Sequence, residues 1–231
     1  QLEGVRVIGD PNLFAIDYYN NGADELLYMD SVASLYGRNS LSELISKAVK
    51  NVFIPITVGG GIRSIEDAYN IFRSGADKIA INTAAVQNPN LITELVREFG
   101  SQSVVISIEA KNIKTNCWEV YTECGREKTG IDVFEWAKKS VDLGVGEILI
   151  TSVDREGTRK GFDNQLINIL TKNFNIPIIA SGGMGTKEHL LELVQMTNVD
   201  AVCMADMIHY KKSTLKELRK FSIDNGINVR K

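Results

Sequence analysis

An internal repeat with a fixed spacing constrains the fold of this chain more than any other feature. The segment GADELLYMDS at 22–31 resembles GVGEILITSV at 144–153. Farther along, IPITVGGGI at 54–62 resembles IPIIASGGM at 176–184, so both pairs are 122 residues apart (144 − 22 and 176 − 54). Two independent pairs with one offset indicate that one half of the fold was duplicated and fused to its copy.

Short apolar runs alternate with amphipathic stretches from one end of the chain to the other. Seven runs are almost continuously apolar, as is typical of strands buried on both faces of a parallel sheet. They lie at 25–31, 54–60, 77–82, 103–111, 147–153, 176–182 and 201–207. The stretches with helical periodicity lie at 64–75, 88–100, 132–144 and 186–197. Strand–helix alternation predicts a parallel sheet, and the duplicated halves favour a (β/α)8 TIM barrel over an open doubly wound sheet.

The ends of the helical stretches carry ordinary start and stop signals. Ser64, Asn88 and Thr186 are residues that commonly cap a helix N-terminus. Glycines at 75, 100 and 144 stand where helices are expected to end.

An eight-stranded barrel needs one strand more than these runs provide. The run at 103–111 has no counterpart, because the position 122 residues before Glu109 falls ahead of residue 1. Seven parallel strands would leave two long edges unpaired. We therefore expect residues 1–231 to form a single barrel domain that is N-terminally incomplete and lacks its first strand.

Composition and charge exclude several classes of protein. The chain of 231 residues has 44% hydrophobic and 24% charged residues, and its net charge of −3 gives no case for nucleic acid or an anionic membrane as a partner. No apolar stretch approaches the ~18–20 residues of a membrane span, and we expect no secretory signal. Three cysteines and two histidines lack metal-ligand spacing. We expect a cytoplasmic protein without a metal or cofactor.

Two glycine clusters follow strands related by the repeat. Gly59–Gly61 come after one strand and Ser181–Gly183 after its counterpart. Glycine lets a backbone N–H approach an anion closely, so each cluster suits a phosphate, although a tight turn alone would also explain either one. Because the two clusters are repeat-related, we favour two phosphates, with Gly60, Gly61, Ser181, Gly182 and Gly183 as ligands. Asn82 and Thr83 are expected to add donors on the first side.

Three carboxylates are predicted at strand C-terminal ends, where a parallel barrel places its chemistry. They are Asp30, Glu109 and Asp154. General acid–base catalysis needs carboxylates whose pKa values are set by burial and neighbours. Strand alternation points Glu109 inward and makes it the strongest candidate, whereas Asp30 or Asp154 alone are also typical of a helix cap or loop anchor.

Charged residues also stand at strand starts, on the opposite face of the barrel. Glu25 and Glu147 begin repeat-related strands, and Asp77 and Lys78 begin another. They are either a structural ring of ion pairs or a charged gate and docking surface. The basic run at 210–220 is predicted to be the solvated face of a last helix.

Six segments carry a signature that is more specific than a generic barrel. They are GADELLYMDSVAS, VGGGIRSIEDA, GADKIAINTAAVQNP, FGSQSVVISIEAK, GEILITSVDREGT and ASGGMG. Together they resemble the cyclase subunit of imidazole glycerol phosphate synthase, over essentially all of residues 9–230. The resemblance implies a (β/α)8 barrel that receives ammonia from a glutaminase docked on its bottom face. It further implies that ammonia attacks a bis-phosphorylated formimino ribulosyl nucleotide, giving imidazole glycerol phosphate and an aminoimidazole carboxamide ribotide.

The resemblance also assigns roles to individual residues. Gly60, Asn82 and Thr83 would hold one phosphate, and Gly182 and Gly183 the other. Glu25, Lys78 and Glu147 match the ammonia gate. Asp77 matches a position that contacts the glutaminase.

Two positions depart from the family. Its two catalytic carboxylates are aspartates, of which one lies on the absent first strand and the other is Glu109 here. Beside Ala205 at the last strand, Asp206 replaces a phosphate-binding serine, and its charge would repel a phosphate by about 4 kcal/mol per charge pair at ~4 Å. An accessory barrel that passes ammonia to a sugar amidotransferase of surface-polysaccharide synthesis is therefore the alternative. A phosphosugar isomerase is a third possibility that the predicted gate disfavours.

Overall fold

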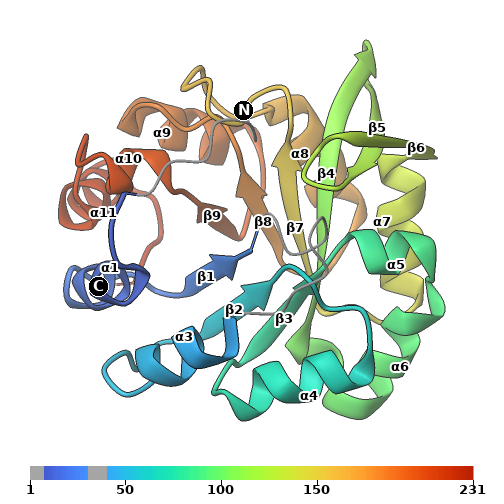
Figure 1. Cartoon of the computed structure of the whole chain (residues 1–231). Coiled ribbons are helices and arrows are strands. Elements are labelled where there is room, and N and C mark those ends of the chain that lie inside the picture. Colours follow the sequence, from blue (N-terminus) through green and yellow to red (C-terminus); the bar gives the residue numbers. More distant parts are fainter. Residues whose placement is uncertain (1–7, 31–40, 231) are drawn as a thin grey trace.

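The computed structural model describes residues 8–30 and 41–230, and its centre is a ring of parallel strands. Seven strands pair in the order β1-β2-β3-β4-β7-β8-β9 (Figure 1). They are β1 (Leu26–Met29), β2 (Ile56–Gly59), β3 (Lys78–Ile81), β4 (Val104–Lys114), β7 (Glu147–Ser152), β8 (Ile178–Ser181) and β9 (Ala201–Cys203). Each lies within or overlaps one of the seven apolar runs, so the predicted strand positions are confirmed; Ser31, at the end of the first run, lies outside the described residues.

Helices surround the ring and cover the outer face of its strands (Figure 1). They are α1 (Pro11–Asn20), α3 (Leu41–Ala48), α4 (Ile65–Arg73), α5 (Thr83–Gln87), α6 (Asn90–Phe99), the 3-10 turn η1 (Ser101–Ser103), α7 (Val133–Asp142), α8 (Asn164–Asn173), α9 (Lys187–Met196), α10 (Asp206–His209) and α11 (Leu215–Asp224). Ser64 and Thr186 cap α4 and α9 as predicted. The prediction for Asn88 is wrong: Pro89 caps α6, and Asn88 instead follows the short helix α5.

The core has two layers because side chains alternate between the two faces of each strand. Inside the ring, Ala80, Val105 and Leu149 form a small apolar cluster. The larger layer lies between strands and helices and includes Ile79, Ile106 and other residues of the opposite face. Residues of the same parity as Ala80, Val105 and Leu149 therefore face the interior, and those near strand C-termini line the mouth.

A two-stranded extension beside β4 was not predicted from the sequence. β4 continues past the ring to Lys114 and pairs antiparallel with β5 (Cys117–Thr122), which pairs with β6 (Glu127–Asp132). The extension lies beside α7 in Figure 1. Residues of β5 alternate between half-buried and buried, and those of β6 are mostly exposed, so no continuously apolar run marks the extension.

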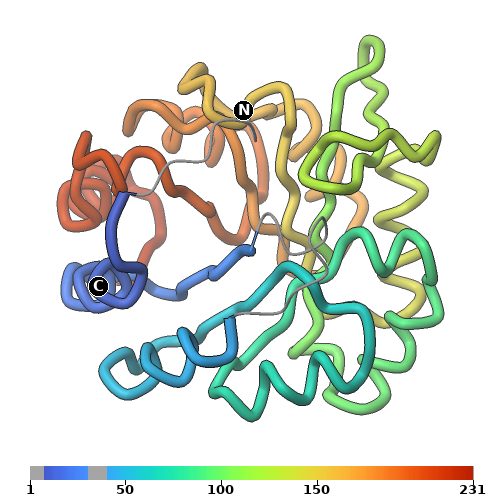
Figure 2. The backbone as a smooth tube through the Cα atoms, viewed as in Figure 1, coloured from blue at the N-terminus to red at the C-terminus, as the bar shows by residue number. Residues whose placement is uncertain are grey.

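Among the residues that the structure describes, helices rather than strand pairing occupy the side of the ring where β1 and β9 face each other. Within residues 8–30 and 41–230, no strand pairs with the outer edges of β1 and β9. Arg219 of α11 forms an ion pair with Asp24 at 3.0 Å, just before β1. Arg219 also donates to the carbonyl oxygens of Gly22, just after α1, and of Arg230, so the C-terminal segment up to Arg230 lies on this side of the ring (Figure 2). The architecture confirms the predicted (β/α) barrel.

None of the helices in the described part of the chain is long and apolar enough to cross a membrane. The three cysteines are all free thiols.

Candidate active site

Glu109 lies at the mouth of the ring, on the interior face of β4. It shares that face with Val105, and its carboxyl group is largely buried. Burial raises its pKa to about 7, against the lowering effect of two hydrogen-bond donors. A carboxyl group with this pKa holds a proton about half of the time at neutral pH. It can therefore act as either an acid or a base.

The two donors to Glu109 come from different elements. The side-chain amide of Asn82, at the end of β3, donates to Oε2 at 3.0 Å. The backbone N–H of Gly125, in the turn between β5 and β6, donates to the same atom at 2.9 Å. Asn82 also donates to the carbonyl oxygen of Tyr121 at 3.3 Å. The hairpin that the sequence did not reveal thus reaches the predicted catalytic carboxylate.

Thr83 lies beside this network. Its hydroxyl accepts a hydrogen bond from the backbone N–H of Glu123 at 3.2 Å. A threonine hydroxyl that accepts one bond still has its own hydrogen to donate. Asn82 and Thr83 therefore stand at the mouth as predicted, and both contact the hairpin turn.

The other two predicted carboxylates have local partners. Asp30 follows β1, and its backbone N–H donates to the carbonyl oxygen of Gly59 at 2.9 Å. Asp154 is exposed, and its Oδ2 accepts from the backbone N–H of Asn112 at 2.6 Å. Asp154 thereby ties the loop after β7 to the extension of β4, which agrees with its alternative interpretation as a loop anchor.

The two glycine clusters have the same backbone conformation. Gly60 and Gly61 have φ values of 98° and 74°, and Gly182 and Gly183 have 94° and 104°. A Cβ atom at Gly60 would overlap the carbonyl oxygen of Asp30, and one at Gly183 would overlap that of Gly161. Both clusters therefore need glycine for close backbone approach as well as for a left-handed conformation.

Asp206, which the sequence places at the second phosphate site, forms ion pairs with two cationic side chains. Its carboxylate forms a bidentate pair with Arg159, with both N–O distances 2.6 Å, and a further ion pair with Lys212 at 3.3 Å. These partners hold the pKa of Asp206 below its ordinary value, with the Arg159 hydrogen bonds as the largest cause. The negative charge of Asp206 is thus neutralised by two cations, which offsets the repulsion that this carboxylate would exert on a phosphate.

The neighbouring loop packs closely on the second cluster. A Cβ atom at Gly185 would touch the Cβ of Arg159, and one at Gly182 would lie 3.3 Å from a carboxylate oxygen of Glu156. Burial raises the pKa of Glu156. At the end of β8, Ser181 lies beside Cys203 of β9 in the register of the sheet. Ala205, next in line, is the N-terminal cap residue of α10.

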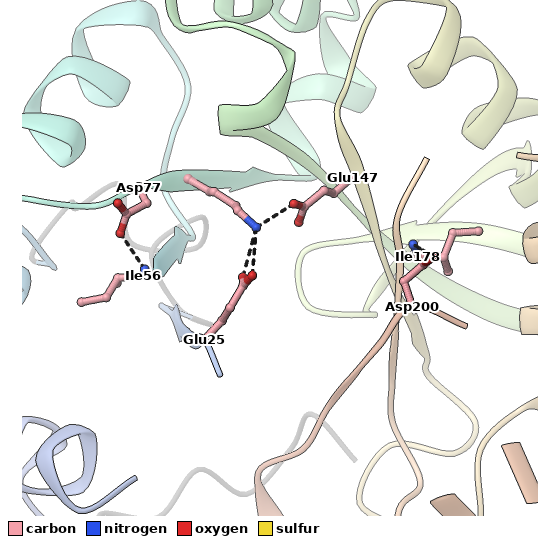
Figure 3. A network of polar contacts seen from close by, with 7 residues as sticks. Glu25, Ile56, Asp77, Glu147, Ile178 and Asp200 are labelled. Atoms are coloured by element: carbon pink, nitrogen blue, oxygen red, sulfur yellow. Dashed lines mark hydrogen bonds and ion pairs between the residues drawn. The ribbon is translucent and has the colours of Figure 1, made fainter. Parts of the chain in front are cut away.

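At the opposite end of the ring, one lysine contacts both repeat-related glutamates (Figure 3). Lys78 Nζ lies 3.1 Å from Glu25 and 2.6 Å from Glu147. The side chains of Lys78 and Glu147 are only 16% and 14% exposed, whereas that of Glu25 is 46% exposed. The predicted cluster is thus assembled, and strand alternation places its side chains on the interior side of the ring, as it does for Glu109.

The carboxylate of Asp77 accepts a hydrogen bond from the backbone of a neighbouring strand, and Asp200 makes the equivalent bond in the second half of the barrel. Asp77 Oδ2 accepts from the backbone N–H of Ile56 at 2.8 Å, and Asp200 accepts from that of Ile178 at 2.8 Å (Figure 3). Both carboxylates therefore hold the start of the neighbouring strand. Asp77 is nonetheless exposed and has a second carboxylate oxygen for a partner.

Each aspartate also borders a cavity on this face. The first cavity, of about 380 Å³, is lined mainly by apolar residues that include Phe53, whose exposed fraction is 75%. The second, of about 370 Å³, has Asn175 at the position equivalent to Phe53. The first cavity is the more apolar of the two.

The described residues contain no group of three histidine, cysteine, aspartate or glutamate side chains able to hold a metal ion.

Comparison with known proteins identifies the family. The family model of the histidine biosynthesis protein matches residues 3–214. The chain belongs to this family. Imidazole glycerol phosphate synthase subunit HisF of Legionella pneumophila is 60% identical over 187 residues, which cover 81% of this chain and 88% of that protein. HisF of Bacillus cereus (strain G9842) is 44% identical over 227 residues, which cover 98% and 90%. HisF of Hydrogenobaculum sp. is 44% identical over 222 residues, with 96% and 88% covered. The resemblance to HisF noted in the sequence is thereby confirmed.

Several residues of this HisF-family site were missed by the sequence analysis. They are Glu123 and Gly125 in the hairpin turn and Arg159 and Lys212 around Asp206. Lys212 was grouped with a helical face at 210–220, but α11 begins only at Leu215. The available signal for the turn was a glycine next to charged residues in the segment TECGRE at 122–127.

Proposed function

We propose that this chain is the cyclase subunit of an imidazole glycerol phosphate synthase. It uses ammonia from a glutaminase partner to convert the bis-phosphorylated formimino ribulosyl nucleotide to imidazole glycerol phosphate and aminoimidazole carboxamide ribotide. The observation that carries the proposal is the buried Glu109 with a pKa near 7, at the mouth of a barrel whose curated relatives are HisF subunits.

Ring closure requires proton transfers to and from nitrogen and oxygen atoms of the substrate. In its protonated form Glu109 donates to a leaving oxygen or nitrogen, and in its ionised form it removes a proton from the attacking amine. Oε2 already accepts two hydrogen bonds, so the carboxyl group has a fixed orientation. We assign Glu109 the central acid–base role and give Asp30, beside the first glycine cluster, a supporting role.

The two ends of the substrate bind to the two halves of the mouth in this proposal. Gly60, Gly61, Asn82 and Thr83 hold one phosphate through backbone N–H groups and the Thr83 hydroxyl, because both amide hydrogens of Asn82 are already donated to Glu109 and Tyr121. The other phosphate binds at Ser181, Gly182 and Gly183, near Ala205. There Arg159 and Lys212 offset the charge of Asp206. These two cations attract a dianion against the carboxylates of Asp206 and of Glu156, which lies near Gly182.

Ammonia enters from the opposite face in this proposal. Lys78, Glu25 and Glu147 lie on the interior side of the ring at that face, and their opposite charges form a polar constriction that a small neutral molecule can pass. The glutaminase docks around Asp77, where exposed Phe53 lines the more apolar of the two cavities. An exposed aromatic beside a charged residue is typical of a protein interface.

Turnover of the purified full-length protein tests this proposal directly. We expect imidazole glycerol phosphate to form from the formimino ribulosyl nucleotide and an ammonium salt, with Glu109→Gln lowering kcat about 10²- to 10⁴-fold. Glu127→Gln removes an exposed carboxylate from β6 and is the matched control. Absence of turnover in the unmodified protein would refute the proposal.

The accessory-barrel alternative has no support from the comparisons, whose curated relatives are named as synthase subunits. It would be favoured by one result: capture of a glutaminase that depends on Asp77, with no cyclase turnover.

A further inference from the structure

The turn between β5 and β6 has an unusual backbone. Glu123, Cys124 and Gly125 are three consecutive residues with positive φ values, of 51°, 59° and 73°. A non-glycine residue in this region is uncommon, and two in succession need support from the surrounding structure. Such outliers are concentrated at functional sites, so the turn is a candidate for a role at the mouth of the ring.

The turn is fixed to the barrel from several sides. Glu123 N–H bonds to Thr83 Oγ1, and Gly125 N–H bonds to Glu109 Oε2. Farther along the hairpin, buried Trp118 donates to Asp163, the cap residue of α8, at 2.8 Å. These bonds hold the turn over the mouth and bring Glu123 close to Glu109.

One of the two oxygens of the Glu123 carboxylate is shielded from solvent. Its Oε2 atom is buried and has no hydrogen-bond partner among the described residues. A buried carboxylate oxygen without a donor costs free energy, since it has lost water without a replacement. On an exposed hairpin an outward rotamer would avoid that cost, so the buried position of this oxygen calls for a functional explanation.

We propose that Glu123 is a positioning residue for Glu109: the hairpin turn places a second carboxylate beside the acid–base group and so maintains its protonated form. This inference rests on the proposed function and extends it to a residue outside the family assignments made above. The negative charge of Glu123 raises the pKa of Glu109, in addition to the larger effect of burial. Two nearby carboxylates commonly behave in this way, because both cannot ionise at low cost.

Other charged or titratable groups also surround Glu109. Cys124 and Arg126 lie on the same hairpin, and the Cys124 thiol interacts electrostatically with Glu109 and Asp30. On β4 itself, Lys111 lies over the Tyr121 ring, 5.2 Å from its centroid. Burial raises the pKa of Cys124 to about 11, so this thiol is neutral near pH 7. Glu123 is then the charged group of the turn that favours protonation of Glu109.

The test is the titration of Glu109 in Glu123→Gln. The titration is followed by carbon-13 NMR of labelled glutamate, and the Glu109 signal is assigned with Glu109→Gln. We expect the titration midpoint of Glu109 to fall by several tenths of a pH unit from about 7. The pH profile of kcat/KM should move down with it. Glu127→Gln removes an equal charge from an exposed position of the same hairpin and should leave the midpoint in place.

A conservative variant separates charge from structure. Glu123→Asp keeps the charge and tolerates the left-handed backbone, so it should retain the high midpoint. If Glu123→Gln moves the midpoint no more than Glu127→Gln does, or if Glu123→Asp lowers it equally, the inference is wrong. A shifted midpoint in a protein without cyclase turnover would refute the proposed function and leave this inference standing.

Discussion

The two halves of the barrel share a backbone and differ in the side chains placed on it. Strands β1 and β2 of the first half correspond to β7 and β8 of the second, with the glycine turns in the same conformation. At the mouth, however, the first half offers the neutral pair Asn82 and Thr83, and the second offers the ion cluster of Arg159, Asp206 and Lys212.

The same contrast appears at the other end. Asp77 and Asp200 make equivalent bonds, yet the next residues are Lys78 and Ala201. Duplication thus preserved what forms the barrel, and the chemistry diverged in the side chains around it. Equivalent positions can therefore serve as controls for each other.

The largest contrast in pH-dependent stability is expected between the carboxylates of Glu109 and Asp206. Glu109 has a raised pKa, so its ionisation destabilises the fold as pH rises from about 4.5 toward 7, by about 3 kcal/mol at most. Glu109→Gln should therefore be more stable than the unmodified protein above pH 7, and the difference should vanish below pH 4.

Asp206 should behave in the opposite way. Its pKa is lowered by Arg159, so it stabilises the fold above its unfolded pKa and loses this contribution as pH falls. Asp206→Asn should lose less than about 1 kcal/mol at pH 7, because solvent screens the pair. Urea unfolding at pH 4, 5.5 and 7.5 measures both variants; equal signs would contradict the contrast.

A second comparison concerns the glycine turns. Gly60→Ala and Gly183→Ala each combine a strained φ with overlap on a backbone carbonyl, and each should lower the free energy of unfolding by more than about 2 kcal/mol. Gly226→Ala is the matched control, since Gly226 has a φ of 73° and open space around it. It should lose only about 1 kcal/mol. Thermal and urea unfolding would show whether the two halves respond alike.

A third comparison separates the two glutamates that contact Lys78. Glu147 is the more buried, so Glu147→Gln should destabilise the protein by about 1–2 kcal/mol, and Glu25→Gln by under about 1 kcal/mol. Equal losses would show that burial does not set the strength of this cluster. Ammonium-dependent turnover of both variants would report separately on the proposed gate.

The smallest contrast is expected for the paired aspartates. Asp77→Ala and Asp200→Ala each remove one backbone hydrogen bond of 2.8 Å and should lose about 1 kcal/mol alike. Glutaminase affinity, measured by titration calorimetry, should fall only for Asp77→Ala. A fall in both would point to a disturbed strand start rather than to a contact at Asp77.

The barrel was predictable because its strands have a strong and repeated signal. Runs such as DKIAIN and EILITS are apolar on both faces, and the fixed offset of 122 residues relates EILITS at 147–152 to ELLYMD at 25–30. The inward direction of Glu109 followed from strand alternation alone. Its position in a buried network did not, since the partners Asn82 and Gly125 are separated from it by 27 and 16 residues.

The hairpin and the cation cluster were missed for different reasons. β6 is mostly exposed and polar, so no periodicity distinguishes it from a loop. Arg159 and Lys212 come from separate loops that meet only because β7 and β9 end at the same face. Such clusters depend on tertiary proximity, which a single sequence does not encode in a local pattern.

One lysine between two glutamates has a consequence for symmetric versions of this barrel. Doubling the segment that contains Glu25 and Lys78 would give two lysines opposite two glutamates, an electrically balanced arrangement. Doubling the segment that contains Glu147 and Ala201 would give two glutamates facing each other without a cation. At this cluster the first segment is thus the electrically balanced starting unit for an artificial homodimeric barrel, because it carries the amino group of Lys78.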